Sequence, residues 1–220
     1  EQYLLEAKNL SKYFPVKNFF GKLVQEVRAV DRVNLSIKKG ETFGLVGESG
    51  CGKSTLGRTL IRMYEPTDGI LTYDGHDITK TKGKELLAYH KRMQIIFQDP
   101  YSALDPHQNV REIMAEPISV FEKLPEKEMD ERIVSLLEKV GMKADDMEKY
   151  AYEFSGGQRQ RIGIARALSV SPEFLLCDEP ISALDVSIQA QVVNVLEDLQ
   201  QELGLTYLFV AHDRSMVRHI

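Results

Sequence analysis

The run Gly47-Glu48-Ser49-Gly50-Cys51-Gly52-Lys53-Ser54-Thr55 indicates the fold class of this chain of 220 residues. It follows a short apolar run over Thr42–Val46 and opens a helical pattern, with Leu56, Leu60 and Met63 spaced along one face. Glycines let such a backbone curl so that successive N–H groups point at phosphate oxygens, and the helix N-terminus behind them adds positive partial charge. A glycine-rich strand-to-helix turn without a ligand is the alternative, and the strand-loop-helix context disfavours it. The run therefore predicts a phosphate-binding loop in an α/β fold.

Two side chains of this loop suit a bound nucleotide, and two acids later in the chain complete the pattern. Lys53 would supply a mobile cation for the β- and γ-phosphates, and the Ser54 hydroxyl can complete an octahedral Mg²⁺ shell of hard oxygen ligands. The apolar run 174–177 is followed by Asp178 and Glu179. Asp178 would hold the metal directly or through water, and Glu179 would orient or deprotonate the attacking water. An exposed pair of acids at a strand end is the alternative.

The composition is that of an ordinary globular protein with a mildly acidic balance. Lys and Arg together number 28, Asp and Glu together number 33, and the formal net charge is −5. Because no Lys- and Arg-rich tract stands out, we expect no nucleic-acid partner. The longest unbroken apolar run, 207–211, has five residues, whereas a membrane span needs roughly 20. Cys51 and Cys177 lack metal-ligand spacing, which favours a reducing cytosol; a redox switch between them is the alternative.

Strand and helix patterns alternate on both sides of a middle region with a different texture. Apolar strands are expected at 69–75, 93–97, 174–177 and 206–211. A long helix is expected at 188–203, and this alternation predicts a parallel sheet covered on both faces. Before the phosphate loop, residues 4–37 have β patterns at both ends, with a loop expected over 15–25.

The middle region, residues 99–157, is charged and helical and is punctuated by prolines. Gly141 is placed to end a helix whose apolar stripe consists of Met129, Ile133, Leu136, Leu137 and Val140. The stripe is most simply core-facing, with a partner-binding groove as the alternative. We therefore expect a helical subdomain at 99–157, inserted into an ATPase-like core formed by 1–98 and 158–220.

The run 154–161, Phe-Ser-Gly-Gly-Gln-Arg-Gln-Arg, resembles the signature sequence of ATP-binding cassette (ABC) ATPases. Further landmarks follow that family's order: Gln98 matches its Q-loop glutamine, 182–185 its D-loop, and His212 its switch histidine. The resemblance extends over essentially all 220 residues. It implies a phosphate-loop (P-loop) NTPase fold, with a mixed central sheet, an N-terminal antiparallel β-layer and the inserted helical subdomain.

The resemblance also implies an ATP hydrolase that uses ATP and Mg²⁺, with site residues in three overlapping groups. The catalytic group is Lys53, Gln98, Glu179 and His212. The metal-binding group is Ser54, Gln98 and Asp178. The ATP-binding group is Phe14, Gly47, Glu48, Ser49, Gly50, Cys51, Gly52, Lys53, Ser54, Thr55, Ser155, Gly156, Gly157, Gln158 and Asp185.

Two of these assignments have a plain structural alternative. Tyr13 and Phe14 lie where the family stacks an aromatic ring on adenine, and alignment favours Phe14; packing inside the N-terminal sheet is the alternative. His212 follows the strand expected at 206–211, so it would emerge at the end of a parallel strand and contact the γ-phosphate. A loop histidine without a ligand is the alternative there.

A second anion site is expected where Ser155, Gly156 and Gly157 precede a helix that begins at Gln158. A plain N-cap at Ser155 is the alternative. The resemblance implies a head-to-tail dimer with two composite sites, in which 155–158 of one subunit closes over the γ-phosphate bound by the other. It further implies that Gln98 links the nucleotide state to movement of the helical insertion.

Three stretches are similar to the oligopeptide and dipeptide branch of bacterial ABC importers, which includes nickel and glutathione systems: 29–31, 46–55 and 97–106. The resemblance implies a peripheral motor at the cytoplasmic face of the cell membrane. Its partners would be a second ABC ATPase subunit, transmembrane permease subunits and, indirectly, a solute-binding protein. The solute, the homo- or heterodimeric pairing and the transport direction stay open. Chains of that branch continue past the switch histidine, so we expect a C-terminal part beyond Ile220 to be missing.

A soluble ABC ATPase of DNA repair or translation is the alternative function. Chromosome-maintenance members with long coiled coils insert them between the phosphate loop and the signature, and the segment here is short and lacks sustained heptads. Translation factors of the family carry two cassettes in one chain, and one is present here. Both points favour the transporter motor.

Overall fold

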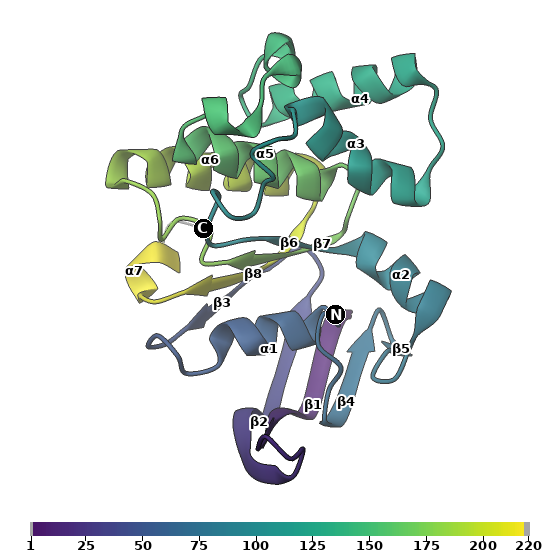
Figure 1. Cartoon of the computed structure of the whole chain (residues 1–220), viewed down its shortest axis with the longest axis vertical. Helices are drawn as coiled ribbons and strands as arrows, with labels where there is room; N and C mark the ends of the chain where they lie inside the picture. Colours follow the sequence, from purple (N-terminus) through teal and green to yellow (C-terminus); the bar gives the residue numbers. More distant parts are fainter. Residues whose placement is uncertain (1, 218–220) are drawn as a thin grey trace.

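Two four-stranded sheets organise the part of the chain that the structure, a computed structural model, describes, residues 2–217 (Figure 1). One sheet is antiparallel with strand order β2-β1-β4-β5, and the other is parallel with order β3-β8-β7-β6. Helix α1 lies between the sheets, while α5 and α6 cover the other face of the parallel sheet (Figure 1). The α/β architecture with an antiparallel β-layer is confirmed. The two strand directions are divided between two sheets, however, and are not mixed within one central sheet.

The antiparallel sheet is built on a long N-terminal hairpin. Its strands are β1 (Tyr3–Lys17), β2 (Leu23–Lys38), β4 (Asp68–Tyr73) and β5 (His76–Asp77). The loop expected over 15–25 is wrong in extent, because the β1–β2 ladder leaves only 18–22 unpaired. Pro15 fits inside β1 because β4 pairs with β1 only as far as Ser11 and leaves that edge open beyond it.

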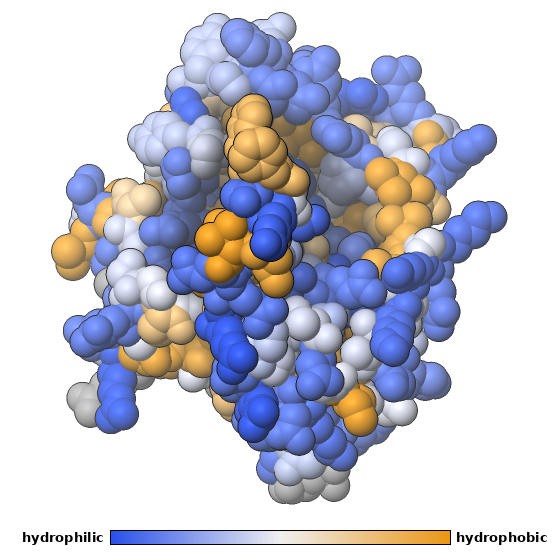
Figure 2. Space-filling view, turned by 60° about the horizontal axis from the view of Figure 1, so that its bottom comes forward, coloured by the Kyte–Doolittle hydropathy of each residue, from blue (hydrophilic) through white to orange (hydrophobic). Residues whose placement is uncertain are grey.

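Local polar bonds shape the tip of this hairpin. The Asn18 side chain accepts hydrogen bonds from the N–H groups of Phe20 and Lys22, at 3.0 and 2.9 Å. Phe19 and Phe20 are 99% and 90% exposed, with their rings edge to face. Figure 2, in which the bottom of Figure 1 comes forward, shows hydrophobic groups set within a largely hydrophilic surface. The turn geometry, and not burial of the two aromatic rings, therefore determines the shape of the tip.

The parallel sheet presents the carboxyl ends of its strands at one edge. The strands are β3 (Thr42–Val46), β6 (Met93–Ile96), β7 (Phe174–Asp178) and β8 (Thr206–Ala211). These bounds match the predicted strands to within one residue. Every residue of β7 and β8 is buried, as expected for central strands covered by helices on both faces.

Helix α1 (Lys53–Leu60) begins at the end of the phosphate loop and is shorter than the apolar pattern predicts. Its apolar face is buried among residues of both sheets. Met63, expected on the same face, lies beyond the helix and is 45% exposed. The chain turns away there because Arg62 has a left-handed φ of 60° and the Met63 N–H bonds back to the Arg58 carbonyl oxygen.

The remaining elements form the helical part of the molecule. They are α2 (Gly83–Arg92), α3 (Val110–Phe121), α4 (Glu126–Lys139), η1 (Ala144–Glu148), η2 (Ala151–Glu153), α5 (Gly156–Leu168), α6 (Val186–Leu203) and α7 (Arg214–Val217). The predicted stripe faces the core: four of its residues are buried and Leu136 is half-buried. Gly141 follows α4 with a φ of 77° and ends the helix as predicted.

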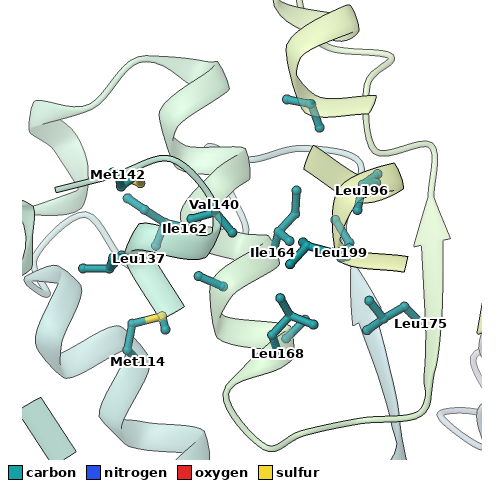
Figure 3. Packing of buried hydrophobic residues seen from close by; sticks show 14 of the residues in the cluster. Met114, Leu137, Val140, Met142, Ile162, Ile164, Leu168, Leu175, Leu196 and Leu199 are labelled. Atoms are coloured by element: carbon teal, nitrogen blue, oxygen red, sulfur yellow. The ribbon is translucent and has the colours of Figure 1, made fainter. Parts of the chain in front are cut away.

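Helix α5 joins the helical insertion to the core. Figure 3 shows Ile162 of α5 beside Val140, and Ile164 of the same helix beside Leu199 of α6. One continuous hydrophobic cluster therefore runs from α3 and α4 through α5 to α6 and the parallel sheet. Because α5 packs against both the insertion and the sheet in this cluster, it positions the insertion over the sheet.

Candidate functional site

A cleft of about 400 Å³ lies where the parallel strands end, the place where ligands bind in open α/β sheets. Its walls come from the first half of β2, the phosphate loop and the segments that follow β6, β7 and β8. The lining residues are Val27, Arg28, Ala29, Ser49, Gly50, Cys51, Gly52, Lys53, Ser54, Thr55, Gln98, Glu179 and His212. The structure thus brings together most of the loop residues with Gln98, Glu179 and His212, which were predicted from distant parts of the sequence.

The phosphate loop is held in a conformation that depends on glycine. Gly50 and Gly52 have φ values of 78° and 94°. A Cβ added at Gly52 would lie 2.2 Å from the Ala29 carbonyl oxygen, a distance that no side chain can occupy. The Lys53 ammonium folds back on the loop, with Nζ 2.5 Å from the Glu48 carbonyl oxygen. The loop therefore curls tightly against β2, with Lys53 at its centre.

Asp178 joins the end of β7 to the loop. Its Oδ1 accepts a hydrogen bond from Ser54 Oγ at 2.7 Å, and its Oδ2 lies 3.3 Å from Nη2 of Arg58. The carboxylate is almost fully buried. Burial opposes the charge of Arg58, but hydrogen bonding to Tyr64 and the charge of Asp178 raise the pKa of the guanidinium above its ordinary value. The buried Asp178 is therefore paired with a cation on one side and a hydroxyl on the other.

Glu179 and His212 face each other across the ends of β7 and β8. His212 Nε2 lies 3.0 Å from Glu179 Oε2. Glu179 is buried and has a φ of 50°, and its N–H donates to the Val210 carbonyl oxygen at 3.0 Å. Gln98 lines the same cleft with an exposed side chain. An acid, a histidine and an amide thus converge on one space at the ends of three strands.

Phe14 lies beside the cleft but not in its lining. It pairs across the ladder with Val27, which does line the cleft. The Phe14 ring packs edge-on against Tyr64, with centroids 5.5 Å apart, and the Lys12 ammonium lies 5.1 Å from its centre. The present contacts of the ring are therefore packing contacts, and adenine stacking on Phe14 stays a prediction.

Ser155 and Gln158 lie exposed at the start of α5, outside the cleft. They form a capping box: the Ser155 N–H donates to Gln158 Oε1 at 3.1 Å, and the Gln158 N–H donates to Ser155 Oγ at 3.4 Å. Asp185 is likewise exposed, at the N-cap of α6. The structure does not bring these predicted ATP-binding residues to the phosphate loop of the same chain, and it shows the capping role that was the alternative for Ser155.

The two signature glycines permit close packing. A Cβ added at Gly157 would lie 2.4 Å from Ile188 Cγ2 of α6, and one added at Gly156 would lie 3.1 Å from the Tyr101 hydroxyl. Glycine at both positions therefore lets α5 approach α6 and the segment after β6.

Sequence reasoning missed residues 27–29 and Arg58. The cleft wall at 27–29 is created by strand pairing and loop packing, which leave no local motif. Arg58 lies one helical turn after Ser54, and that spacing is the one signal that could have placed it near Asp178. The cysteines are both free: Cys51 is exposed, while burial and then the charge of Asp178 raise the pKa of the Cys177 thiol.

The fold and the cleft define a phosphate-loop nucleotide-binding protein. A sequence model of the ABC transporter family matches residues 30–182. The chain belongs to the ABC transporter family and has the ATPase cassette of that family.

Two curated relatives show the level of similarity. The oligopeptide transport ATP-binding protein AppF of Bacillus subtilis (strain 168) is 50% identical over 222 residues, which cover 100% of this chain and 68% of AppF. The dipeptide transport ATP-binding protein DppF of Haemophilus influenzae is 48% identical over 217 residues, which cover 99% of this chain and 66% of DppF. The chain thus spans about two thirds of the length of these relatives.

Among solved structures, the ATP-binding cassette MJ0796, a dimer in a post-hydrolysis state with ADP and Pi, has a TM-score of 0.85. It is 28% identical, and the match covers 98% of this chain and 90% of that one. No helix within residues 2–217 combines the length and the apolar character that crossing a membrane requires.

Proposed function

We propose that this chain is the ATP-hydrolysing subunit of a membrane ABC transporter that imports oligopeptides or dipeptides. The names and similarity of its relatives support peptide transport. The subunit would work at the cytoplasmic face of the cell membrane, paired with a second ABC ATPase subunit and docked on transmembrane permease subunits. A solute-binding protein would deliver the peptide to those permeases.

One observation carries the catalytic part of the proposal: the Glu179–His212 pair lies in the same cleft as the phosphate loop. Lys53 and the loop N–H groups would bind the phosphates, with the N-terminus of α1 adding its partial charge. Glu179 would orient or deprotonate the attacking water, and His212 would contact the γ-phosphate. Their mutual contact at 3.0 Å keeps the carboxylate oriented toward the cleft before a nucleotide arrives.

The residues at the end of β7 fit a magnesium ion shared with the nucleotide. Ser54 and Asp178 offer a hydroxyl and a carboxylate 2.7 Å apart, and Gln98 offers an amide oxygen in the same cleft. Mg²⁺ prefers such hard oxygen donors and takes the rest of its shell from water and substrate phosphates. Within the described residues, no group of three or more His, Cys, Asp or Glu side chains forms a separate metal cage. The ion would neutralise phosphate charge when bound.

The exposed start of α5 supports a composite site. Because Ser155 to Gln158 cannot be part of their own cleft as the chain is folded, we infer that they close over the nucleotide of a second cassette. Asp185, exposed at the N-cap of α6, would lie at the same interface. Hydrolysis depends on positioning and on charge stabilisation, so a site divided between two chains would act only when closed.

The domain organisation that serves this cycle is a core of 1–98 and 158–220 with the helical subdomain 99–157 inserted. Gln98 stands at the junction, since it follows β6 in the core and precedes the insertion. A nucleotide that contacts Gln98 would therefore bias the position of the insertion, which is the part that we expect to move with the permeases.

The variant Glu179→Gln tests the assignment. It should retain ATP binding, accumulate an ATP-bound dimer and lower kcat by roughly 10²- to 10⁴-fold, the usual contribution of a general base. Steady-state phosphate release and light scattering with ATP would measure the two effects.

Glu173→Gln, the same change at the amino end of β7, is the matched control. It removes the negative charge of the ion pair with Arg92, at 2.9 Å and far along the strand from the cleft, and should leave turnover near wild type. Wild-type turnover in Glu179→Gln would remove Glu179 from the catalytic role. Uptake of labelled peptide by proteoliposomes that contain the permeases would then test transport itself.

A further inference from the structure

A buried glutamine of α5 connects the two segments that carry Gln98 and Glu179. Gln160 is only 2% exposed. Its Nε2 donates to the Phe97 carbonyl oxygen at 3.1 Å and to the Pro180 carbonyl oxygen at 2.7 Å. Each of these carbonyls belongs to a residue next to a candidate catalytic residue.

The two hydrogen bonds of Gln160 lie just beyond the last residues that pair between β6 and β7. The β6–β7 ladder ends at the pair Ile96–Cys177, so no ladder hydrogen bond joins the residues that follow. A carboxamide has two N–H donors, and Gln160 directs them to these two carbonyl oxygens, of which the bond to Pro180 is buried. The side chain thus continues the connection between β6 and β7 beyond their last paired residues.

We propose that Gln160 is a positioning residue that sets the relative placement of Gln98 and Glu179. This inference rests on the proposed function of those two residues. Gln160 does not line the cleft or contact a reacting group. It acts through the two backbone segments that it hydrogen-bonds, at Phe97 and Pro180.

Other side chains of α5 hold the same segment after β6. The Arg159 guanidinium lies 4.5 Å from the centre of the Tyr101 ring, and Arg166 Nη1 donates to the Ala103 carbonyl oxygen at 2.9 Å. Since α5 begins at the signature residues, a shift of this helix on closure of a dimer would carry Gln98 and Glu179 with it. Among these three side chains, Gln160 is the one that hydrogen-bonds both the segment of Gln98 and the segment of Glu179.

The variant Gln160→Met tests the proposal, because it removes both donors while keeping the length of the side chain. Misplacement of reacting groups by about 1 Å can cost 10²-fold in rate, so kcat should fall by roughly 10- to 100-fold. The KM for ATP should change by less than about twofold, because the phosphate loop is untouched. Gln160→Asn, which keeps the donors on a shorter arm, should give an intermediate kcat and serves if the methionine variant does not fold.

Gln200→Met is the matched control for lost stability. Gln200 Nε2 also bridges separate segments, since it donates to Thr42 Oγ1 at 2.9 Å and to the carbonyl oxygens of Leu205 and Gly40 at 3.2 and 3.4 Å, but at the amino-terminal edge of the sheet. It should lower the melting temperature as Gln160→Met does and leave kcat unchanged. Equal kcat in the two variants would overturn the positioning role.

Combination with Glu179→Gln separates this inference from the proposed function. If Gln160 acts through Glu179 and Gln98, the double variant should lose clearly less than the product of the two single losses, because the placement of Glu179 no longer affects the rate. Losses that multiply would overturn the inference. Full turnover in Glu179→Gln alone would instead refute the proposed function, whatever Gln160→Met does.

Discussion

Gly52 and Glu179 of the cleft both hold left-handed backbone conformations and reach them in different ways. Gly52 has a φ of 94° and no Cβ, so the conformation costs it little. Glu179 carries a side chain at a φ of 50°, which the surrounding structure must hold in place. Its N–H bond to Val210 does this by tying it to β8. The left-handed conformation at Gly52 thus depends on the residue being glycine, whereas that of Glu179 depends on its hydrogen bond to β8.

Gly52→Ala should therefore abolish nucleotide binding and lower stability by at least about 2 kcal/mol, through a strained φ and a clash with the Ala29 carbonyl. Gly50→Ala is the comparison, because Gly50 has a φ of 78° but open space around its Cα. It should cost only the strain, about 1–2 kcal/mol. Chemical unfolding and binding of a fluorescent ATP analogue measure both effects, and equal stability losses would contradict the clash.

At this scale, sequence predicts what spacing encodes and misses what only folding brings together. Gly50, Gly52, Lys53 and Ser54 belong to one continuous motif, so their place in a cleft could be predicted. Arg58 beside Asp178 depends on a contact between residues 120 positions apart. For Phe14, alignment with the family predicts a contact with adenine. It does not predict the contact that the ring makes in the structure, with Tyr64, because Tyr64 belongs to no motif.

At the scale of elements, the central strands were predictable because fully buried parallel strands are continuous apolar runs. The ends of α1 and of the first hairpin were not. Met63 has the spacing of the helix but follows a left-handed Arg62, and Pro15 sits in a strand because its outer edge is open. The first outcome follows from a local turn bond, from the Met63 N–H to the Arg58 carbonyl oxygen, and the second from where the pairing of β4 with β1 ends; the apolar pattern contains neither.

The short element η1 has a buried acid whose charge the fold favours. Asp146 accepts hydrogen bonds from the Lys143 N–H at 3.0 Å and from the Lys149 ammonium at 2.6 Å. Burial opposes the charge, but these partners outweigh it and hold the pKa of Asp146 below its ordinary value. Because the folded pKa is the lower one, the stabilisation is fully present above the unfolded pKa of about 4 and is lost as the pH falls from there through the lower folded pKa.

Asp146→Asn should lower stability by about 1–2 kcal/mol at pH 7, since a charged hydrogen-bond acceptor is lost. Its stability should also fall less steeply than that of the wild type between about pH 5 and pH 2. Urea unfolding across this pH range gives both quantities. The neighbouring exposed Asp145 supplies the control, because Asp145→Asn should leave the wild-type pH dependence in place. Parallel pH curves for wild type and Asp146→Asn would refute the assignment.

At the scale of the whole molecule, two helix N-termini that we propose to bind phosphate lie on separate surfaces. One is the start of α1 in the cleft, and the other is the start of α5, where Ser155 and Gln158 are exposed. The continuous cluster through α5 fixes this separation, because the helix cannot swing into its own cleft without breaking the packing of the insertion. Order along the sequence predicted both sites, but their distance in space required the fold.

If the second surface serves a partner chain, Ser155→Arg in a Glu179→Gln background should abolish ATP-driven dimerisation and leave ATP binding by the monomer within about twofold, since an arginine at this position obstructs a closed interface. Ser155→Ala is the control: it loses the cap, worth about 1 kcal/mol, but adds no bulk, so the dimer should still form. Light scattering and equilibrium binding measure the two quantities. Dimerisation of Ser155→Arg like that of its parent would contradict a composite site. A parallel loss of monomer binding would instead place Ser155 beside the nucleotide of its own chain.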